Sequence, residues 1–364
     1  MFNLSKRLYQ LLSLALLILT MSACATNDPQ KKVGLAFPDL DNERWRREEA
    51  MLSILLAEKG YEVVSLVANQ DARLQSDQID NLVAEGVKAI IVVAVDGNAI
   101  VPAVEAAILA DVRVLAYDRL IKSPKISAYL SFDNREAGRL QASGLLEALD
   151  IDNRPAIQRM VRLVRLSADP IDYNVSLYNL GQADAFAPYI QERRVRLVAD
   201  EIITSREQIS AQRLMETILK EEENDVDGVL VSNEIIAQGV VQALQAAGLE
   251  DVIFVAGQES STTANGIAKG ELVFSVFRDT RDLPPLAVSI LDSILKEKSL
   301  LELDRCLMSD LTGDETQTGT IFCVLLPVQP LTQDSLFDLV VKSGYESYDD
   351  VYREIPDGSR PARP

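Results

Sequence analysis

The chain alternates short runs of β-branched and other apolar residues with longer segments whose apolar residues recur at helical spacing. This alternation begins at Lys31 and continues through most of the sequence. Repeated strand, helix, strand order predicts an α/β fold with parallel sheets that are covered by helices on both faces. The runs predict strands over 33–37, 62–66, 87–95, 112–117, 126–132, 160–166, 195–200, 226–231, 252–256 and 272–277, and the longer segments predict helices over 46–59, 74–85, 98–110, 135–149, 176–192, 207–220, 235–247 and 281–298.

Glycines directly follow several of the predicted helices. Gly60, Gly86 and Gly248 occupy the position just past the last turn, where glycine is favoured. The segment 87–95 is apolar at almost every position, which is typical of a central strand buried on both sides. A length of 364 residues favours two domains over one.

Polar residues gather directly after the predicted strands. Ligands of open α/β sheets bind outside the carboxyl ends of the strands, so this placement alone predicts a binding site. The two halves of the chain each carry such a set, and two sheet edges that face each other would enclose one cleft. The residues are Asp39 to Arg46, Asp96 to Asn98, Asp118, Arg119, Asp133, Asn134, Ser232 to Glu234, Gln258, Glu259 and Arg278.

These side chains suit a neutral, polyhydroxylated ligand. Carboxylates accept hydrogen bonds from neighbouring hydroxyls, guanidinium groups donate in pairs, and amides do both. Trp45 is the only tryptophan, and its ring would cover the apolar face of a sugar. Structural alternatives remain open: Trp45 packs in the core, Asp118 caps a helix or bonds a loop, and Asp133 with Asn134 caps the following helix.

The composition excludes several function classes. No histidine is present, which excludes Ser-His-Asp and Cys-His catalysis and histidine-ligated metal sites. The net charge of −19 argues against nucleic acid as a partner. Gly-rich phosphate-binding motifs are absent, so no nucleotide cofactor is implied. The acidic stretch 310–315 does not match the spacing of an EF-hand and favours a solvated loop over a metal site.

The N-terminus has the pattern of a bacterial lipoprotein export signal. Lys6 and Arg7 precede an apolar run over 11–19, and Met21-Ser22-Ala23 leads to Cys24. The run is too short for a comfortable bilayer span. Cleavage before Cys24 would leave its thiol and amine free for lipidation, which predicts a chain anchored outside the cytoplasmic membrane. The alternative is an ordinary signal peptide with an incidental cysteine.

Two further cysteines, Cys306 and Cys323, are separated by a polar segment that contains glycine. In an oxidising compartment such a pair most simply forms a disulfide, which would close a short local loop of the chain. Two free buried thiols are the alternative.

Several segments together resemble the type I periplasmic sugar-binding proteins that feed ATP-binding-cassette importers, the xylose-binding members in particular. No single motif is specific, but many occur in the same order, and the resemblance runs from about Lys31 to the end. The segments are Lys32 to Ala36, Asp39-Leu40, Glu43 to Trp45, Val112 to Arg119, Ser131 to Asn134, Gly257-Gln258, Leu325 to Val328 and Val340 to Tyr345.

The resemblance implies two doubly wound α/β lobes that are joined by three crossing segments and close over sugar like a hinge. We expect the signal peptide over 1–23 and a tether over 24–30. The N-terminal lobe would comprise 31–132 and 280–319, the C-terminal lobe 133–279 and 320–354, and a frayed tail 355–364.

Carried over by position, the resemblance implies a set of sugar contacts from both lobes. Trp45 would stack on the sugar, and Arg46, Asp118 and Arg119 would bind hydroxyls from the first lobe. The second lobe would contribute Asp172, Asn174 and Gln258. It is also where the chain departs from the xylose-binding pattern, with Arg206 and Ser210 in place of a tryptophan and an asparagine, Glu234 and Glu259 in place of aspartates, and Arg278 in place of a lysine.

A carboxylate displaced by one methylene group does not meet the same pair of hydroxyls, and a lost bond of this kind costs on the order of 1.5–3 kcal/mol. We therefore expect a retained sugar site of altered preference, in which Glu234 and Arg278 bind a different aldose. Complete loss of sugar binding is the alternative.

Three function classes fit these observations. The first is a lipid-anchored receptor that captures a monosaccharide and delivers it to an ABC permease without any cofactor. The second is the ligand-sensing subunit of a membrane sensor kinase or chemoreceptor. The third is a glycosidase with paired carboxylates such as Asp118 and Glu234, which the absence of chemistry in the resembled family disfavours.

Overall fold

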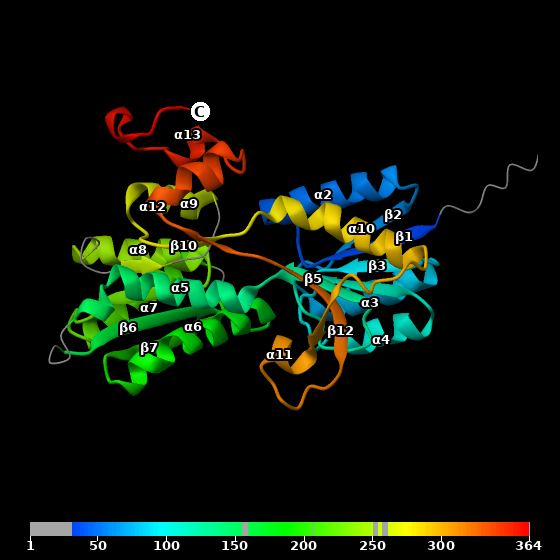
Figure 1. Cartoon of the computed structure of the whole chain (residues 1–364), viewed down its shortest axis with the longest axis horizontal. Coiled ribbons are helices and arrows are strands. Elements are labelled where there is room, and N and C mark those ends of the chain that lie inside the picture. The colour runs from blue at the N-terminus through cyan, green and yellow to red at the C-terminus, as the bar shows by residue number, and fades with distance from the viewer. Residues whose placement is uncertain (1–30, 155–158, 206, 250–253, 257–260, 364) are drawn as a thin grey trace, which may run out of the picture.

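The computed structural model describes residues 31–154, 159–205, 207–249, 254–256 and 261–363. The described chain forms two α/β lobes, and three segments cross between them (Figure 1). The crossings connect β5 (Ala128–Phe132) to α5 (Asn134–Ala148), β10 (Ser275–Phe277) to α10 (Leu283–Leu295), and β12 (Thr320–Leu326) to β13 (Gln329–Leu331). The predicted fold of two doubly wound parallel-sheet lobes is confirmed.

The first lobe contains a sheet in the order β11-β12-β5-β4-β3-β1-β2, which is parallel except for the pair β11 and β12. Helices α3 and α4 pack on one face and α2 and α10 on the other, so that β3 is buried on both sides as predicted. The strands are β1 (Lys32–Phe37), β2 (Glu62–Val67), β3 (Ala89–Val92), β4 (Arg113–Tyr117), β5 (Ala128–Phe132), β11 (Asp304–Leu307) and β12 (Thr320–Leu326), and the helices are α2 (Glu43–Glu58), α3 (Ala72–Ala84), α4 (Val101–Leu109), α10 (Leu283–Leu295) and α11 (Met308–Thr312).

The second lobe repeats this topology around the parallel sheet β7-β6-β8-β9. Its first strand again lies between the second and the third, as β1 does in the first lobe. The strands are β6 (Val161–Ala168), β7 (Val195–Ile203), β8 (Gly228–Val231) and β9 (Phe254–Ala256), the helices are α5 (Asn134–Ala148), α6 (Tyr173–Gln191), α7 (Gln208–Glu221), α8 (Glu234–Ala247) and α9 (Ser261–Lys269), and an antiparallel pair joins β10 (Ser275–Phe277) to β13 (Gln329–Leu331).

The predicted lobe boundary at residue 320 is wrong. Strand β12 pairs in parallel with β5, from Cys323 opposite Tyr129 to Leu326 opposite Phe132. Residues 320–326 therefore belong to the first lobe, and the third crossing follows Leu326.

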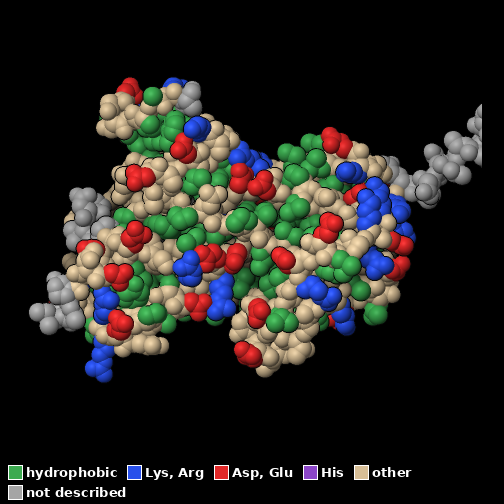
Figure 2. All heavy atoms as spheres, in the orientation of Figure 1, with side chains coloured by type: hydrophobic (Ala, Val, Ile, Leu, Met, Phe, Trp, Pro, Cys, Tyr) green, Lys and Arg blue, Asp and Glu red, His purple; other side chains and the backbone are tan. Residues whose placement is uncertain are grey.

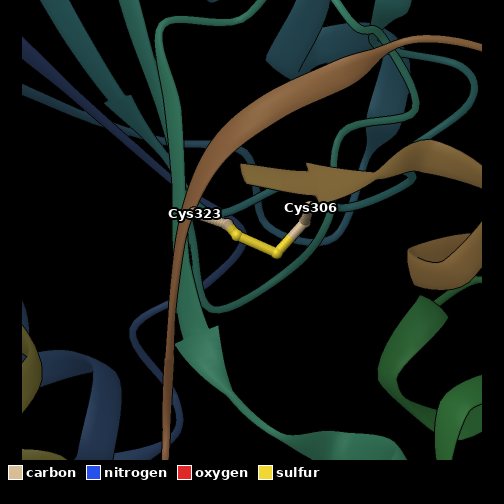
Figure 3. The surroundings of a disulfide bond; sticks show 2 residues. All are labelled: Cys306 and Cys323. Atoms are coloured by element: carbon tan, nitrogen blue, oxygen red, sulfur yellow. A yellow bond between two sulfur atoms is a disulfide. The ribbon is translucent and has the colours of Figure 1, made fainter. Parts of the chain in front are cut away.

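The predicted disulfide is confirmed. Cys306 on β11 is bonded to Cys323 on β12 and thereby fastens the antiparallel edge strand of the first lobe (Figure 3). The stretch 310–315, predicted as a solvated loop, is helical over its first three residues, because the short helix α11 (Met308–Thr312) ends at Thr312 and buries Leu311 and Thr312.

The C-terminal segment is folded, so the predicted frayed tail is wrong for residues 355–363. The segment forms short helical elements that pack on the second lobe beside α9 (Figure 1). These elements are α12 (Gln333–Leu336), a π-helical turn (Phe337–Lys342), α13 (Tyr348–Val351) and a 3-10 turn (Asp357–Ser359). Ile355 is only 9% exposed within the core of that lobe, and the Tyr348 hydroxyl donates to the Pro361 carbonyl at 2.7 Å.

Candidate functional site

A cleft of about 700 Å³ lies between the two lobes. Its lining includes the loops that follow β1, β4, β6 and β8, which is the edge of the sheets predicted from the sequence. Acidic and basic side chains lie close together along the boundary between the lobes (Figure 2). The predicted sugar contacts found in the lining are Trp45, Asp118, Arg119, Asp172, Asn174, Glu234 and Arg278.

Asp118 is a buried carboxylate at the centre of this site. It directly follows β4, has a positive φ of 62° and is 2% exposed. Its backbone is held by the neighbouring strand, since its N–H donates to the Leu130 carbonyl at 2.7 Å and its carbonyl accepts from the Ser131 hydroxyl at 2.7 Å. The carboxylate accepts from Arg44 Nη2 at 2.7 Å and from Asn174 Nδ2 at 3.2 Å, so both lobes bond to it.

Arg44 is a cleft residue that the sequence analysis did not single out. Its Nε donates to Glu48 Oε1 at 2.6 Å, and its guanidinium lies 4.4 Å from the centroid of the Trp45 ring. Glu48 is itself buried and accepts from the Tyr117 hydroxyl at 2.7 Å. Arg44 thus supplies one positive charge to two buried carboxylates.

The structure places Arg46, the predicted sugar contact, elsewhere. Its Nη1 donates to the carbonyls of Leu40 and Asp41 at 2.6 and 2.9 Å, and Arg46 does not line the cleft. Helix α2 begins at Glu43, where the Asn42 side chain caps it, and not at residue 46 as predicted. The basic residue before the tryptophan, and not the one after it, lines the cleft.

Burial and nearby charges together set the ionisation of Asp118 and Glu48. Burial would raise the pKa of Asp118, but the charges of Arg44, Arg278 and Arg119 together lower it, so Asp118 is ionised. Burial raises the pKa of Glu48, and the nearby charge of Arg44 only partly opposes it. The arrangement favours a fixed hydrogen-bond acceptor at Asp118.

Trp45 combines the two roles that the sequence left open. The side chain is only 4% exposed and packs edge-on against Phe37 in the core of the first lobe. Trp45 also lines the cleft. The guanidinium of Arg119 lies 6.0 Å from the centroid of its ring.

The second lobe presents Asn174 through close packing of α5 on α6. A Cβ atom at Gly138 would lie 2.1 Å from the Tyr178 carbonyl oxygen, so only glycine permits this approach. At the N-terminal ends of the two helices, Asn134 Nδ2 donates to Asn174 Oδ1 at 3.0 Å and orients it toward Asp118.

Arg278 lies at the second crossing between the lobes and is 5% exposed. Its Nη1 donates to Asn134 Oδ1 at 3.1 Å and to the Tyr178 hydroxyl at 2.5 Å. Arg278 therefore supports the amide pair of Asn134 and Asn174 from the crossing segment.

Arg119 and Asp172 form an ion pair across the cleft. Arg119 Nη2 lies 2.9 Å from Asp172 Oδ2, while its Nη1 donates to the Ala94 carbonyl at 3.1 Å. The Nε atom of Arg119 is buried and has no hydrogen-bond partner among the described residues. Asp172 also caps α6 by accepting from the N–H of Asn174, so this one side chain serves both the helix and the cleft.

Glu234 is the first residue of α8, whose N-cap is Asn233, and both line the cleft. Gln258 and Arg206 lie outside the described residues. Ser210 is in α7 and does not line the cleft.

The C-terminal segment adds Tyr345 and Glu346 to the lining, which the sequence analysis did not predict. Glu346 of the second lobe lies 3.8 Å from Arg47 Nη2 of the first. The Tyr345 ring packs edge-on against Phe277 beside the second crossing. No local motif marks these two residues as part of a site.

Comparison with protein families decides what the molecule is. Residues 33–299, which include most of both lobes, match the family described as periplasmic binding protein domain. The chain belongs to the periplasmic binding protein family. The resemblance found in the sequence is thereby confirmed.

Two curated relatives of this periplasmic binding protein are named D-xylose-binding periplasmic protein. The one from Escherichia coli K12 is 29% identical over 273 residues, covering 75% of this chain and 80% of the relative. The one from Haemophilus influenzae is 26% identical over 337 residues, covering 92% and 96%. Both relatives are binding proteins by name.

A solved structure has the same arrangement of lobes. It is an ABC transporter solute binding protein from Clostridium phytofermentans with bound β-D-glucose, with a TM-score of 0.74 and 26% identity. The alignment covers 88% of this periplasmic binding protein and the whole of that chain.

The membrane anchor predicted at Cys24 lies outside the described residues. Within the part of the chain that the structure describes, no helix has the length and apolar character needed to cross a bilayer.

Proposed function

We propose that this chain is a lipid-anchored, extracytoplasmic receptor that captures a xylose-like aldose between its lobes and delivers it to an ABC importer. The observation that carries the proposal is the buried carboxylate of Asp118, which bonds to Arg44 in its own lobe and to Asn174 in the other. A ligand that bonds to both lobes stabilises the closed arrangement.

The donors and acceptors around Asp118 match sugar hydroxyls. Asp118 is an ionised acceptor, and the buried Nε of Arg119 is a donor that lacks a partner among the described residues. An unsatisfied buried donor costs about 1–3 kcal/mol, which a ligand hydroxyl would recover. Because its pKa is lowered, Asp118 could not serve as the general acid of the glycosidase alternative, but only as its nucleophile or base.

The sugar is proposed to be an aldose related to xylose. Two relatives are named for D-xylose, and a neighbouring structure holds β-D-glucose. Trp45, Asp118 and Arg119 of the first lobe keep the resembled pattern and line the cleft. The departures at Glu234 and Arg278 lie in or beside the second lobe, so we propose that they alter which hydroxyls are bound there.

The test is a titration of purified protein with D-xylose, D-glucose, D-ribose and D-arabinose, read by Trp45 fluorescence and by the thermal midpoint. A sugar that binds the native state raises the midpoint once its concentration exceeds Kd. We expect at least one aldose to give a saturable response, and we expect Asp118→Asn to reduce the affinity for that aldose more than tenfold. Asp96→Asn is the matched control, because Asp96 follows β3 at the same sheet edge and does not line the cleft. Flat responses to all four sugars would contradict the proposal.

Delivery and anchoring require cellular experiments. Deletion of the gene should abolish uptake of the labelled sugar, whereas uptake that persists while sugar-induced transcription is lost would identify the sensor alternative. Cys24→Ser should release the protein from the membrane fraction and abolish labelling by a palmitate analogue. Retention of the label in that variant would contradict the anchor.

A further inference from the structure

The disulfide-closed segment from Cys306 to Cys323, here termed the clasp, lies in the first lobe but contacts the second. The Tyr173 hydroxyl on α6 donates to the Thr312 carbonyl at the end of α11. Figure 1 places α11 below the crossings, beside the N-terminal end of α6, where Tyr173 is the first residue. The binding function proposed above does not account for this contact.

Other contacts extend the junction between the clasp and α6. The Tyr173 side chain packs against the apolar core of the first lobe, and Lys122 of that lobe lies 3.9 Å from the Tyr173 ring centroid. Gly313 of the clasp lies against Leu180, since a Cβ atom there would be 2.7 Å from Leu180 Cδ1. The junction therefore combines a hydrogen bond, a cation–π contact and apolar packing.

Three consecutive residues of the second lobe contact the first. Asp172 pairs with Arg119, Tyr173 bonds the clasp, and Asn174 bonds Asp118. Tyr173 thus lies between two residues of the proposed sugar site and restricts their positions. Burial and the nearby Asp314 carboxylate raise the pKa of Tyr173 to about 12, so its hydroxyl remains a donor at physiological pH.

We propose that Tyr173 and the clasp determine how tightly the closed lobes hold the sugar. The inference rests on the sugar-binding function proposed above. A contact that exists only when the lobes are together favours the closed state and slows ligand release. The disulfide contributes by joining β11 to β12, which holds α11 in place against Tyr173 (Figure 3). Tyr173 is a positioning residue and bonds no ligand itself in this account.

The first experiment compares two tyrosines on α6. Tyr173→Phe removes only the hydroxyl that reaches the clasp, and Tyr189→Phe, the control, removes a hydroxyl that bonds Asp152 within the same lobe. With D-xylose and D-glucose as probes, stopped-flow Trp45 fluorescence should show a dissociation rate about fivefold higher for Tyr173→Phe, as expected for one net hydrogen bond. Equal rates in wild type and Tyr173→Phe, or an equal increase in Tyr189→Phe, would overturn the proposal.

The second experiment needs no sugar and separates this proposal from the function itself. In Tyr173→Phe, hydrogen exchange should accelerate both in the clasp and at the start of α6, while Tyr189→Phe leaves the clasp unchanged. The double variant Cys306→Ser/Cys323→Ser should likewise accelerate exchange in the clasp and at the start of α6. If wild type binds none of the four sugars but the exchange results hold, the sugar function fails and the clasp contact stands. Unchanged exchange in Tyr173→Phe would refute the contact whatever the sugar result.

Discussion

Arg44 Nη2 lies 2.7 Å from Asp118 Oδ1, although 74 positions separate the two residues in the chain. The pair connects the first turn of α2 to the loop after β4, and Glu48 accepts from the same guanidinium at 2.6 Å. The Arg44 guanidinium therefore contacts two buried carboxyl groups. Both the stability of the first lobe and the geometry of its binding surface depend on this cation.

The first prediction concerns loss of that cation. Arg44→Met leaves Asp118 and Glu48 buried without their nearest positive charge, so we expect the free energy of unfolding at pH 7 to fall by about 3 kcal/mol. Urea unfolding followed by circular dichroism measures it. Arg73→Met, at an exposed position of α3, is the control and should change little. Equal stability of the two variants would show that Arg44 is not required for burial of the carboxylates.

The second prediction follows from the raised pKa of Glu48, whose main cause is burial. A carboxyl group that binds its proton more tightly when folded contributes stability that is full below the unfolded pKa of about 4.3 and is lost as pH rises through the folded pKa. Glu48→Gln does not titrate, so its stability relative to wild type should improve between pH 4.5 and pH 7.5. Urea midpoints across this range test it, and Glu58→Gln, at an exposed position of the same helix, is the control. If the stability of Glu48→Gln relative to wild type instead fell as the pH rises, the pKa of Glu48 would be lowered by folding and the prediction would be wrong.

Much of the fold could be predicted because its signals are local. The periodicity around β1 to β8 and the glycines after α2, α3 and α8 depend on neighbours in sequence, and they indicated the repeated α/β units correctly. Strand β12 was assigned to the wrong lobe because its partner, β5, is distant in sequence. Helix α9 was missed altogether.

The site shows the same division between local and distant information. The carboxyl ends of the strands located the cleft, but the choice between Arg44 and Arg46 depended on where α2 begins. A start at residue 46 leaves Arg44 in a loop, whereas the Asn42 cap places Arg44 and Glu48 one turn apart on the helix. Tyr345 and Glu346 reach the cleft only through packing of the C-terminal segment on the second lobe, which no sequence motif reports.

The third prediction tests the close approach of α5 and α6. In Gly138→Ala the new Cβ would meet the Tyr178 carbonyl at 2.1 Å, and because that atom is backbone the helices must separate. We expect a loss of about 1–3 kcal/mol in stability, as for other overpacked interiors, together with weaker sugar binding as Asn174 shifts. Gly358→Ala serves for comparison, since open space surrounds that position. Calorimetry and sugar titration check both effects, and a Gly138→Ala protein with native midpoint and affinity would rule out the packing argument.

The fourth prediction concerns the ion pair between Arg47 and Glu346 across the cleft. Arg47 is more than half exposed, so the pair contributes at most about 1 kcal/mol to the closed state. Arg47→Met should raise the sugar dissociation rate about two- to fourfold at low salt, and the difference from wild type should vanish near 1 M NaCl. Arg135→Met breaks a comparably exposed pair with Asp184 inside the second lobe and should leave the rate unchanged. A salt-independent effect would mean that packing, and not charge, is responsible.

The fifth prediction follows from the folded C-terminal segment. Ile355 is 9% exposed and packs in the second lobe's core with Val351 and Tyr352, so Ile355→Ala removes buried apolar volume and leaves a cavity. We expect a loss of about 2–4 kcal/mol, given the usual cost of such truncations. Ile202→Ala is the matched control on the same lobe, because Ile202 is 56% exposed and loses little on truncation. Thermal unfolding of the two variants distinguishes a packed segment from a loose tail: equal midpoints would mean that residues beyond 354 add nothing to the lobe. A lower midpoint for Ile355→Ala alone would mean that the segment carrying Tyr345 and Glu346 is packed on the lobe at its C-terminal end as well as through Leu336 and Val340 at its start, which helps those two residues to keep a fixed place in the cleft.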